Sequence, residues 1–178
     1  MKERDRFVSD ELVFDGMLAK AHRVRLEMPD GHIVQRDLIH YPGAVVILPV
    51  LADGSIVLIR NYRFAVDQTL YELPAGCLEK DEKPKACAAR ELAEETGYTA
   101  GQIEKLGAFY TGPGTCDEIM HAFLAVDLTD GKQNLERYEE ITVEVHPESQ
   151  VREMIADGRI IDGKTLACLA LYWVKAGA

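Results

Sequence analysis

Three glutamates stand close together in the chain at a spacing that suits cation binding. Glu91, Glu94 and Glu95 occupy positions i, i+3 and i+4, so in a helix they share one face. Like charges at this spacing repel one another and weaken an isolated helix by roughly a few tenths of a kcal/mol per pair. A bound cation relieves the repulsion, and hard ions such as Mg²⁺ prefer carboxylate oxygens. Taken alone, the pattern indicates either a divalent-metal site or a solvated acidic helix surface.

Residues on either side of these glutamates favour the metal site. Glycines flank the segment at Gly76 and Gly97, and Glu82 and Arg90 stand at fixed positions between them. The segment reads G-x₅-E-x₇-R-E-[apolar]-x-E-E-x-G-[apolar], which resembles the Nudix box. Tyr98 is the one soft departure, because an aliphatic residue is commoner there. The positions that match the box are Gly76, Glu82, Arg90, Glu91, Leu92, Glu94, Glu95 and Gly97.

The resemblance implies a fold, a cofactor and roles for several residues. The fold is a mixed β-sheet sandwiched between helices, with the box as a loop, a helix and a loop. Glu91 and Glu95 would bind the metal together with the backbone carbonyl of Ala75. Glu94 would be a further ligand or a local base, and Glu82 would tie the loop to the helix. The implied cofactor is Mg²⁺, with Mn²⁺ as a substitute.

Pyrophosphate hydrolysis also needs a group that accepts a proton. Metal ions neutralise the phosphate oxygens and lower the pKa of the attacking water, and a general base then takes a proton from that water. The resemblance implies that Arg90 orients the glutamates and that the base comes from a loop beyond the box. We predict Glu139 as the base, with Glu140 and Glu136 as alternatives, because the polar segment 129–136 contains a glycine that permits loop closure.

The segments that flank the box resemble one branch of the Nudix family, the ADP-ribose pyrophosphatases. Upstream, the chain reads R-N-Y-R at 60–63 and E-L-P-A-G at 72–76. Downstream, Gly112 replaces the serine that is usual in this branch, and Thr111 can supply the missing hydroxyl. Arginine offers a planar fork to phosphate oxygens, and a loop carboxylate can accept hydrogen bonds from a ribose. The implied substrate-binding residues are Arg60, Arg63, Glu72, Pro113 and Glu118.

These features predict hydrolysis of the pyrophosphate bond of a nucleoside diphosphate sugar. ADP-ribose is the leading substrate and would give AMP and ribose 5-phosphate. GDP-mannose or another nucleoside diphosphate sugar is the alternative, because related Nudix enzymes share both flanks. Nucleoside triphosphates are disfavoured by the loop that contains Pro113. A non-catalytic nucleotide-sugar sensor is a second alternative, although such sensors can lose metal ligands and this box retains all of them.

The elements that must position the box are strands and helices in mixed order. A continuous apolar run at 44–51 predicts a strand buried on both faces, followed by a strand at 55–60. The helix of the box is expected over 82–96, with Pro84 in its first turn and Gly97 at its end. This order predicts the α/β (α+β) class. Further strands are predicted at 103–110, 119–127 and 141–146, and further helices at 148–157 and 164–175.

The first part of the chain predicts a separate β-hairpin extension. Residues 12–28 carry scattered apolar side chains, P-D-G at 29–31 forms a turn, and 32–39 returns as a strand. We therefore divide the chain into an extension at 1–42 and a Nudix hydrolase domain at 43–178. A free two-stranded ribbon is only marginally stable. Because the ADP-ribose branch exchanges this region across a two-fold axis, we expect a homodimer.

Composition excludes several classes of partner. The net charge of −10 disfavours nucleic acid, because backbone phosphates need a basic surface. No apolar run reaches the ~18 residues of a membrane helix, and the charged start at 1–6 does not resemble a signal peptide, so a cytoplasmic location is expected. The four cysteines lack zinc-site spacing, which favours reduced thiols in or near the core. His40 and His121 lie in apolar strands, and we expect structural roles for both.

Overall fold

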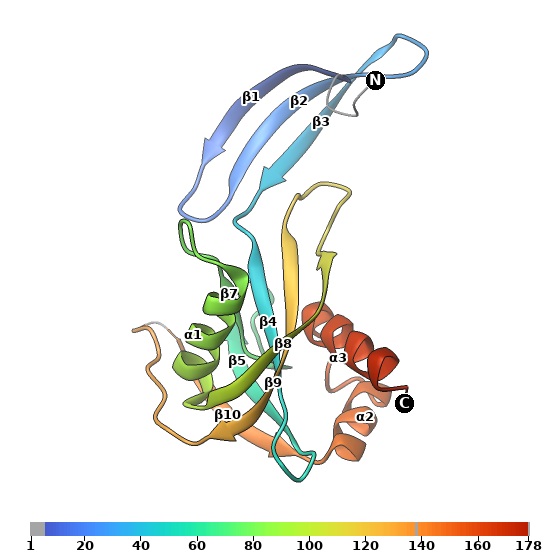
Figure 1. Cartoon of the computed structure of the whole chain (residues 1–178). Helices are drawn as coiled ribbons and strands as arrows, with labels where there is room; N and C mark the ends of the chain where they lie inside the picture. The colour runs from blue at the N-terminus through green and yellow to red at the C-terminus, as the bar shows by residue number, and fades with distance from the viewer. Residues whose placement is uncertain (1–5, 138, 178) are drawn as a thin grey trace. The chain divides into compact units, whose positions relative to one another are not determined.

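The chain forms two compact units (Figure 1). The computed structural model describes residues 6–137 and 139–177. The charged segment 1–6, from which we predicted that the chain has no signal peptide, therefore lies largely outside the described residues. Each unit is assembled from segments that are separated in the sequence. The smaller unit comprises Met1–Gly43 and Tyr110–Ile119, and the larger comprises Ala44–Phe109 and Met120–Ala178.

The smaller unit contains an antiparallel sheet of three strands in the order β1-β2-β3. The predicted hairpin is present as β2 and β3, and Gly31 adopts a positive φ of 85° in the turn between them. Sequence reasoning missed β1, because all of its residues are exposed and its apolar positions carry no regular burial pattern. The strands are β1 (Phe7–Asp15), β2 (Lys20–Glu27) and β3 (Ile33–His40).

The larger unit contains two sheets, ordered β7-β4-β9-β8 and β10-β5-β6, in which β4 and β9 run parallel. Each strand predicted for this part of the chain is present, although β8 begins four residues earlier than predicted. The short strands β6 and β7 were not predicted. The strands are β4 (Ala44–Pro49), β5 (Ile56–Arg63), β6 (Gln68–Glu72), β7 (Ala75–Cys77), β8 (Thr99–Tyr110), β9 (Ile119–Thr129) and β10 (Ile141–His146).

Helices cover both sides of β4, whose residues are all buried (Figure 1). Val45 and Ile47 share one core cluster with residues of α1 (Pro84–Thr96). The intervening side chains of β4 share a second cluster with residues of α2 (Glu148–Ala156) and α3 (Gly163–Ala176). The predicted mixed sheet between helices is confirmed. Among the helices that the structure describes, none is long and apolar enough to cross a membrane.

Candidate active site

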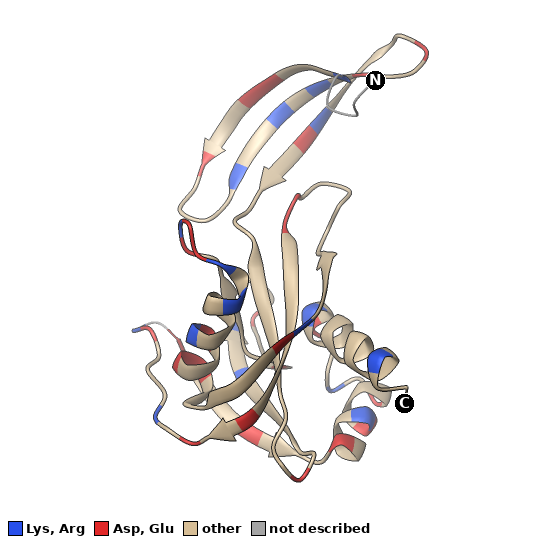
Figure 2. Cartoon of the chain, in the orientation of Figure 1, with Lys and Arg blue, Asp and Glu red and all other residues tan. Residues whose placement is uncertain are grey.

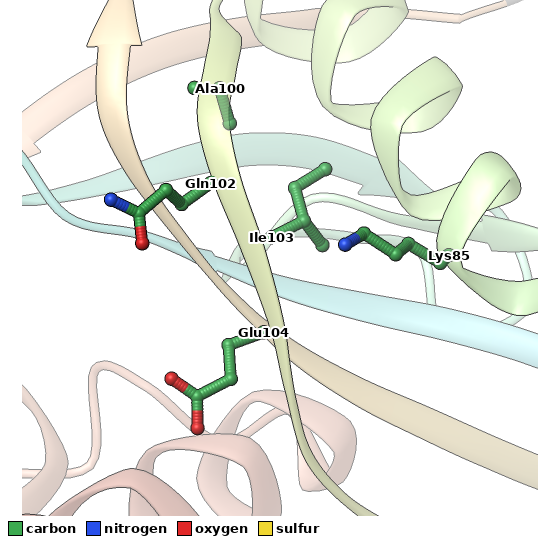
Figure 3. A pocket seen from close by; sticks show the side chains of 6 residues that line it. Lys85, Ala100, Gln102, Ile103 and Glu104 are labelled. Carbon is green, nitrogen blue, oxygen red and sulfur yellow. The ribbon is translucent and has the colours of Figure 1, made fainter.

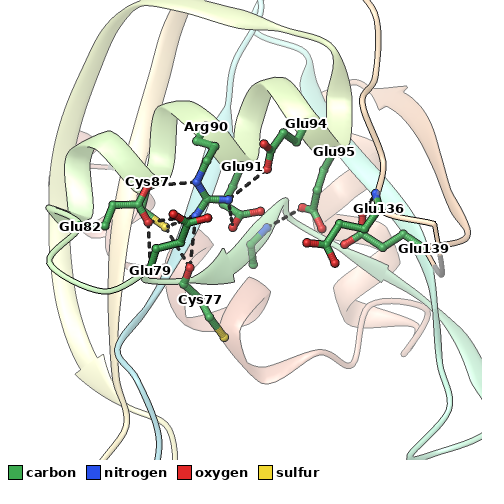
Figure 4. Close-up of polar contacts among 11 residues, drawn as sticks. Cys77, Glu79, Glu82, Cys87, Arg90, Glu91, Glu94, Glu95, Glu136 and Glu139 are labelled. Atoms are coloured by element: carbon green, nitrogen blue, oxygen red, sulfur yellow. Dashed lines mark hydrogen bonds and ion pairs between the residues drawn. The ribbon is translucent and has the colours of Figure 1, made fainter. Parts of the chain in front are cut away.

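Helix α1 carries the three glutamates and has well-defined ends. Pro84 occupies its first turn, where the missing N–H costs no helical hydrogen bond. Gly97 ends the helix in the left-handed conformation, with φ of 82°. Figure 4 shows the glutamate side chains of α1 directed toward β7 and the loop that leads to β10. Acidic positions also gather on α1 and on that loop in Figure 2.

Arg90 binds three carboxylates at once (Figure 4). Its Nε and Nη2 donate to the two oxygens of Glu82, at 3.0 and 2.9 Å. Its Nη1 donates to Glu91 at 2.7 Å and to Glu94, four positions further along the helix, at 3.0 Å. The hydrogen bonds from Arg90 lower the pKa of Glu82 to about 2. Glu82 also accepts from the backbone N–H of Glu79 at 3.0 Å, and it therefore joins the loop to the helix.

Glu95 is the most buried acid of α1, with 3% of its surface exposed. One of its carboxyl oxygens accepts a hydrogen bond of 2.8 Å from the backbone N–H of Ala75, which places β7 against this carboxyl. Burial, together with the charges of Glu91 and Glu139, raises the pKa of Glu95 to about 8, although the hydrogen bond from Ala75 opposes this shift. A cation beside Glu95 would oppose this effect, because an opposite charge favours the ionised form.

Glu91 lies against the backbone of Gly76. A Cβ atom added at Gly76 would lie 2.0 Å from the carboxyl carbon of Glu91, so a larger residue here would displace this carboxyl from its position. Burial raises the pKa of Glu91, while Arg90 lowers it. The first glycine of the motif therefore provides the space that a buried carboxylate of the same motif occupies.

The loop before β10 brings a further carboxylate to this face. The charge of Glu139 raises the pKa of both Glu91 and Glu95, and Figure 4 draws Glu139 beside Glu95. Glu139 also accepts a hydrogen bond of 2.9 Å from the backbone N–H of Glu136. The charge of Glu140 raises the pKa of Tyr62. Among the candidate bases, Glu139 therefore has the clearest electrostatic link to the carboxyls of α1.

This loop is tied to α1 more firmly than its polar composition suggested. The backbone N–H of Asn134 donates to the carbonyl of Glu94 at 2.9 Å. The side chain of Gln133 donates to the carbonyl of Glu95 at 2.6 Å. Sequence reasoning did not single out Gln133, because an amide in a polar loop carries no signal of its own. The hydrogen bonds satisfy carbonyls at the end of α1 that have no partner within the helix.

The donor set on this face suits a hard divalent cation. Carboxylates outnumber cationic groups on this face. Glu91, Glu94, Glu95 and Glu139 gather here, whereas Arg90 pairs with the first two and the charge of Arg63 acts on Glu95. Oxygen ligands from carboxylates are those that Mg²⁺ prefers. The raised pKa of buried Glu95 is a second indication, since the positive charge of Arg63 lowers this pKa but does not offset the effect of burial.

Comparison with known proteins identifies the family. The model of the NUDIX domain matches residues 40–167. The chain belongs to the NUDIX family. It is 36% identical over 173 residues to an ADP-ribose pyrophosphatase of Bacillus subtilis (strain 168), covering 96% of this chain and 94% of that protein. It is 32% identical over 183 residues to a GDP-mannose pyrophosphatase of Shigella flexneri serotype 5b (strain 8401), covering 95% of each.

A solved structure supports the NUDIX fold independently. The crystal structure of an ADP compounds hydrolase superposes with a TM-score of 0.85 at 22% identity, covering 97% of this chain and 95% of that one. At this identity the likeness shows the fold. The predicted membership of the family, and the likeness to its ADP-ribose pyrophosphatase branch, are confirmed by the family match and the relatives together.

A second charged network of the NUDIX protein surrounds Glu72, which has no exposed surface. Arg63 donates to both oxygens of Glu72, at 2.8 and 2.6 Å, and this pairing raises the pKa of the arginine. Lys164 donates to the same carboxylate and, at 2.9 Å, to Asp162. Asp162 in turn accepts from the backbone N–H of Thr165 and caps α3. Glu72 was predicted to bind substrate, but its oxygens are occupied by Arg63 and Lys164.

Sequence reasoning missed the part that Lys164 and Thr165 play in this network. The hydroxyl of Thr165 accepts a hydrogen bond of 2.8 Å from the backbone N–H of Leu73, so α3 is joined to the segment just before the box. The D-G-K-T segment at 162–165 can be recognised in the sequence, but the contact of Lys164 with Glu72 spans 92 positions. Such a contact depends on the tertiary fold.

The remaining predicted substrate-binding residues are spread over both units. Arg60 lies on β5 of the larger unit, with its guanidinium over the ring of Tyr71 at 5.3 Å. Pro113 and Glu118 belong to the smaller unit. There the hydroxyl of Thr111, which the sequence offered as a substitute for the usual serine, donates to Glu118 at 2.7 Å. The structure therefore describes Glu118 with a partner within its own loop.

A separate hollow of about 420 Å³ lies in the larger unit and contains none of the predicted site residues. Figure 3 shows Lys85 of α1 on one side and residues of β8 on the other. Lys85 and Glu104 are the charged residues of its lining. It lacks the convergent polar groups that fix the orientation of a small ligand.

Proposed function

We propose that this NUDIX protein hydrolyses the pyrophosphate bond of nucleoside diphosphate sugars in a reaction that requires Mg²⁺ or Mn²⁺. ADP-ribose is the substrate that we favour, with AMP and ribose 5-phosphate as products. The carboxylate cluster of Glu91, Glu94 and Glu95, placed against β7 by the matched motif, is the observation that carries this proposal. The likeness to the ADP-ribose pyrophosphatase of Bacillus subtilis supports ADP-ribose. The name of the Shigella flexneri relative favours GDP-mannose as the alternative.

In this proposal Glu91 and Glu95 hold the metal with the carbonyl oxygen of Ala75, and Glu94 is a further ligand. A divalent ion, when bound, supplies charge neutralisation of the phosphates and activation of water. Arg90 fixes the orientation of two of these glutamates through its bonds to Glu91 and Glu94. The protein's own contribution is thus a set of carboxylates whose positions are set before any ligand arrives.

We assign the general base to Glu139, since its charge acts on both Glu91 and Glu95. Its side chain would leave the backbone N–H of Glu136 and accept a proton from the attacking water. Glu140 and Glu136 are the alternatives. Arg63, with two bonds to Glu72, presents a fixed guanidinium to phosphate oxygens, and in this proposal Glu72 positions that arginine.

A panel of nucleoside diphosphate sugars tests this function. The full chain is incubated with ADP-ribose, GDP-mannose, other nucleoside diphosphate sugars and a nucleoside triphosphate, each with Mg²⁺, with Mn²⁺ and with excess chelator. We expect metal-dependent release of AMP and ribose 5-phosphate from ADP-ribose at the highest kcat/KM. Preference for GDP-mannose would replace the substrate but keep the reaction. Tight binding without turnover would establish the sensor, and full activity in chelator would overturn the metal requirement.

We also propose that residues 1–42 form a dimerisation region next to a hydrolase domain at 43–178 in a cytoplasmic enzyme. The smaller unit exposes several large apolar side chains, which a second copy would bury. They include Phe7, Leu12, Phe14, Leu18 and Ile33. Sedimentation should show a dimer at micromolar concentration, and replacing Leu12 and Phe14 by serine should shift it toward monomer. A wild-type monomer under these conditions would reject the dimer.

A further inference from the structure

A group of histidines and aspartates lies on one face of the sheet in the smaller unit, apart from the acids of α1. Asp10, His22 and His40 come from β1, β2 and β3 respectively. In the strand register, His22 pairs with Leu12 on one side and Leu38 on the other. Asp10 lies two positions from Leu12 on β1, and His40 lies two positions from Leu38 on β3. Residues two apart share a face, so the three residues form a diagonal line across one face of the sheet.

Their polar atoms are close to one another. Nδ1 of His22 lies 2.5 Å from a carboxyl oxygen of Asp10. The rings of His22 and His40 meet edge to face, with centroids 4.6 Å apart. One ligand atom from each of the three residues lies within 4.8 Å of the other two. Two atoms that bind the same ion at ~2.0–2.2 Å stand about 3 Å apart, so small side-chain rotations would close this group around a cation.

A fourth residue orients the second histidine. Nδ1 of His40 lies 2.5 Å from a carboxyl oxygen of Asp117, whose other oxygen accepts from the backbone N–H of Tyr41 at 3.2 Å. Because Nδ1 is held by this carboxylate, Nε2 is the nitrogen that His40 can offer to an ion. A carboxylate behind a histidine is the usual arrangement around protein-bound metals, where it fixes the ring and raises its basicity.

Two cations on the same face of the sheet are engaged elsewhere. Lys20 pairs with His40 in the register, but its ammonium group binds Asp15 at 3.0 Å. Arg36 stands on the same face, opposite Val24, and donates to the carbonyl of Gln35 at 2.8 Å. Asp10 therefore keeps its charge available. The three side chains are 47%, 19% and 33% exposed for Asp10, His22 and His40, so an ion can reach them from solvent.

We propose that Asp10, His22 and His40 bind a divalent transition-metal ion of the zinc class, with Asp117 as the positioning residue. Two imidazoles and one carboxylate suit Zn²⁺, Co²⁺ or Ni²⁺, whereas Mg²⁺ prefers oxygen ligands alone. The ion would link the three strands of the sheet. Through Asp117 it would also order the segment Tyr110–Ile119, which carries Glu118. The site would thus differ in metal preference from the carboxylates of α1 within the same chain.

Titration of the full-length protein with Zn²⁺, in the presence of excess Mg²⁺ to fill the carboxylate site, tests the proposal. We expect calorimetry to show one Zn²⁺ per chain that Mg²⁺ does not displace. Substitution of His22 or His40 by asparagine should weaken this binding at least tenfold, and Asp117→Asn should weaken it by ~10–100-fold, as loss of an orienting group does. His32→Asn is the matched control, because His32 is an exposed histidine of the same unit that pairs with Asp30.

A second measurement does not depend on the variants. The imidazole resonances of His22 and His40 in the wild-type protein should shift on addition of Zn²⁺, while those of His32 and His146 should not. Circular dichroism establishes that each variant is folded. The proposal fails if His22→Asn and His40→Asn bind Zn²⁺ as the wild type does. It fails equally if Zn²⁺ binding disappears only when Glu91 and Glu95 are replaced, since the ion would then belong to α1.

Discussion

Two networks of charged residues in the larger unit differ in their ratio of acidic to basic side chains. Around Arg90, one guanidinium binds the carboxylates of Glu82, Glu91 and Glu94, and Glu95 stands beside them. Around Glu72, two cations bind one fully buried carboxylate, and Lys164 also binds Asp162. The first network has an excess of negative charge, whereas the second is balanced.

The difference indicates what each network is for. A buried charge is costly unless it is paired, so a balanced network can hold elements together without any ligand. Glu72 joins β6 to β5 through Arg63 and to α3 through Lys164, and in the proposed function it also fixes the guanidinium of Arg63. In an unbalanced network a buried carboxylate stays ionised only at a cost, which protonation or a further cation relieves. The excess acid of α1 is therefore where a metal ion is expected, and the two networks should respond differently to substitution.

The largest effect is expected for Glu95→Gln. The amide has nearly the same shape but is a poorer ligand for a hard cation. Metal ions contribute several kcal/mol to transition-state stabilisation in hydrolases, so we expect kcat to fall ~10³-fold or more. Steady-state kinetics with ADP-ribose across a range of Mg²⁺ concentrations checks this. Glu104→Gln, which removes an exposed acid from β8, is the matched control and should retain wild-type kcat.

Thermal unfolding should accompany these assays. In the metal-free protein the Glu95→Gln variant is expected to be at least as stable as the wild type, because the raised pKa shows that burial disfavours the ionised carboxyl. A variant that unfolds readily would instead place Glu95 among the structural charges, and the contrast between the two networks would be lost.

The next largest effect concerns the balanced network. Lys164→Met removes one of the two cations around Glu72 and should lower the free energy of unfolding by about 3 kcal/mol. This value is at the lower end of the cost of breaking a buried ion pair, because Arg63 still binds Glu72 in the variant. Denaturant titration measures the change. Lys175→Met is a suitable comparison, since Lys175 lies on the same helix and is exposed. At temperatures where Lys164→Met is folded, its kcat should stay within a few fold of wild type; a loss as large as that of Glu95→Gln would contradict the division.

Much of the fold could be predicted because its signals are local. The apolar run of β4 indicated a strand buried on both faces, and the structure has one core cluster on each side of it. Gly97 indicated the end of α1 and adopts a positive φ there. β1 was missed because exposed residues leave no alternation to detect. β6 and β7 are short, and their pairing with β5 and β4 is tertiary.

In the candidate site too, contacts between residues close in sequence were predictable and contacts between distant residues were not. The pairing of Arg90 with Glu94 was predictable from helical spacing, and the Nudix motif provided Glu82 and Gly76. The contact of Lys164 with Glu72 was not predictable, because no motif in the sequence joins positions so far apart. The group of Asp10, His22 and His40 was missed for a similar reason, since it exists only once the register of three strands is known. His40 had been given a structural role.

A third prediction separates the metal ligands from the general base. Glu139→Gln should lower kcat by ~10²-fold, the usual scale for loss of a general base, with little change in Mg²⁺ affinity. The loop should keep its place, because Asn134 and Gln133 hold it to α1 independently of Glu139. Kinetics and Mg²⁺ titration of the variant check both parts. Glu136→Gln, on the same loop, tests an alternative base and should retain near-normal kcat. If Glu139→Gln is nearly normal while Glu94→Gln abolishes turnover, the base lies on α1.

The smallest expected effect is the pH dependence of stability in chelator, which follows from the unbalanced network. Glu95 has a folded-state pKa of about 8, raised from its ordinary value of 4.5 by burial. Its contribution to stability is therefore fully present below pH 4.5 and is lost as the pH rises through 8. Glu82 has the opposite sign but a separate window, since its pKa of about 2 affects stability only as the pH falls below 4.5.

Between pH 5 and 9, the melting temperature of the metal-free wild type should therefore fall relative to that of Glu95→Gln. Subtraction of the two profiles removes the contributions of histidines and of other groups that both proteins share. Addition of Mg²⁺ should reverse the trend in the wild type alone, because metal binding favours the ionised carboxyl and stabilises the folded state. Parallel profiles for the two proteins in chelator would mean that Glu95 is already compensated. The acids of α1 would then be a balanced network like that of Glu72, with no unmet charge to attract an ion.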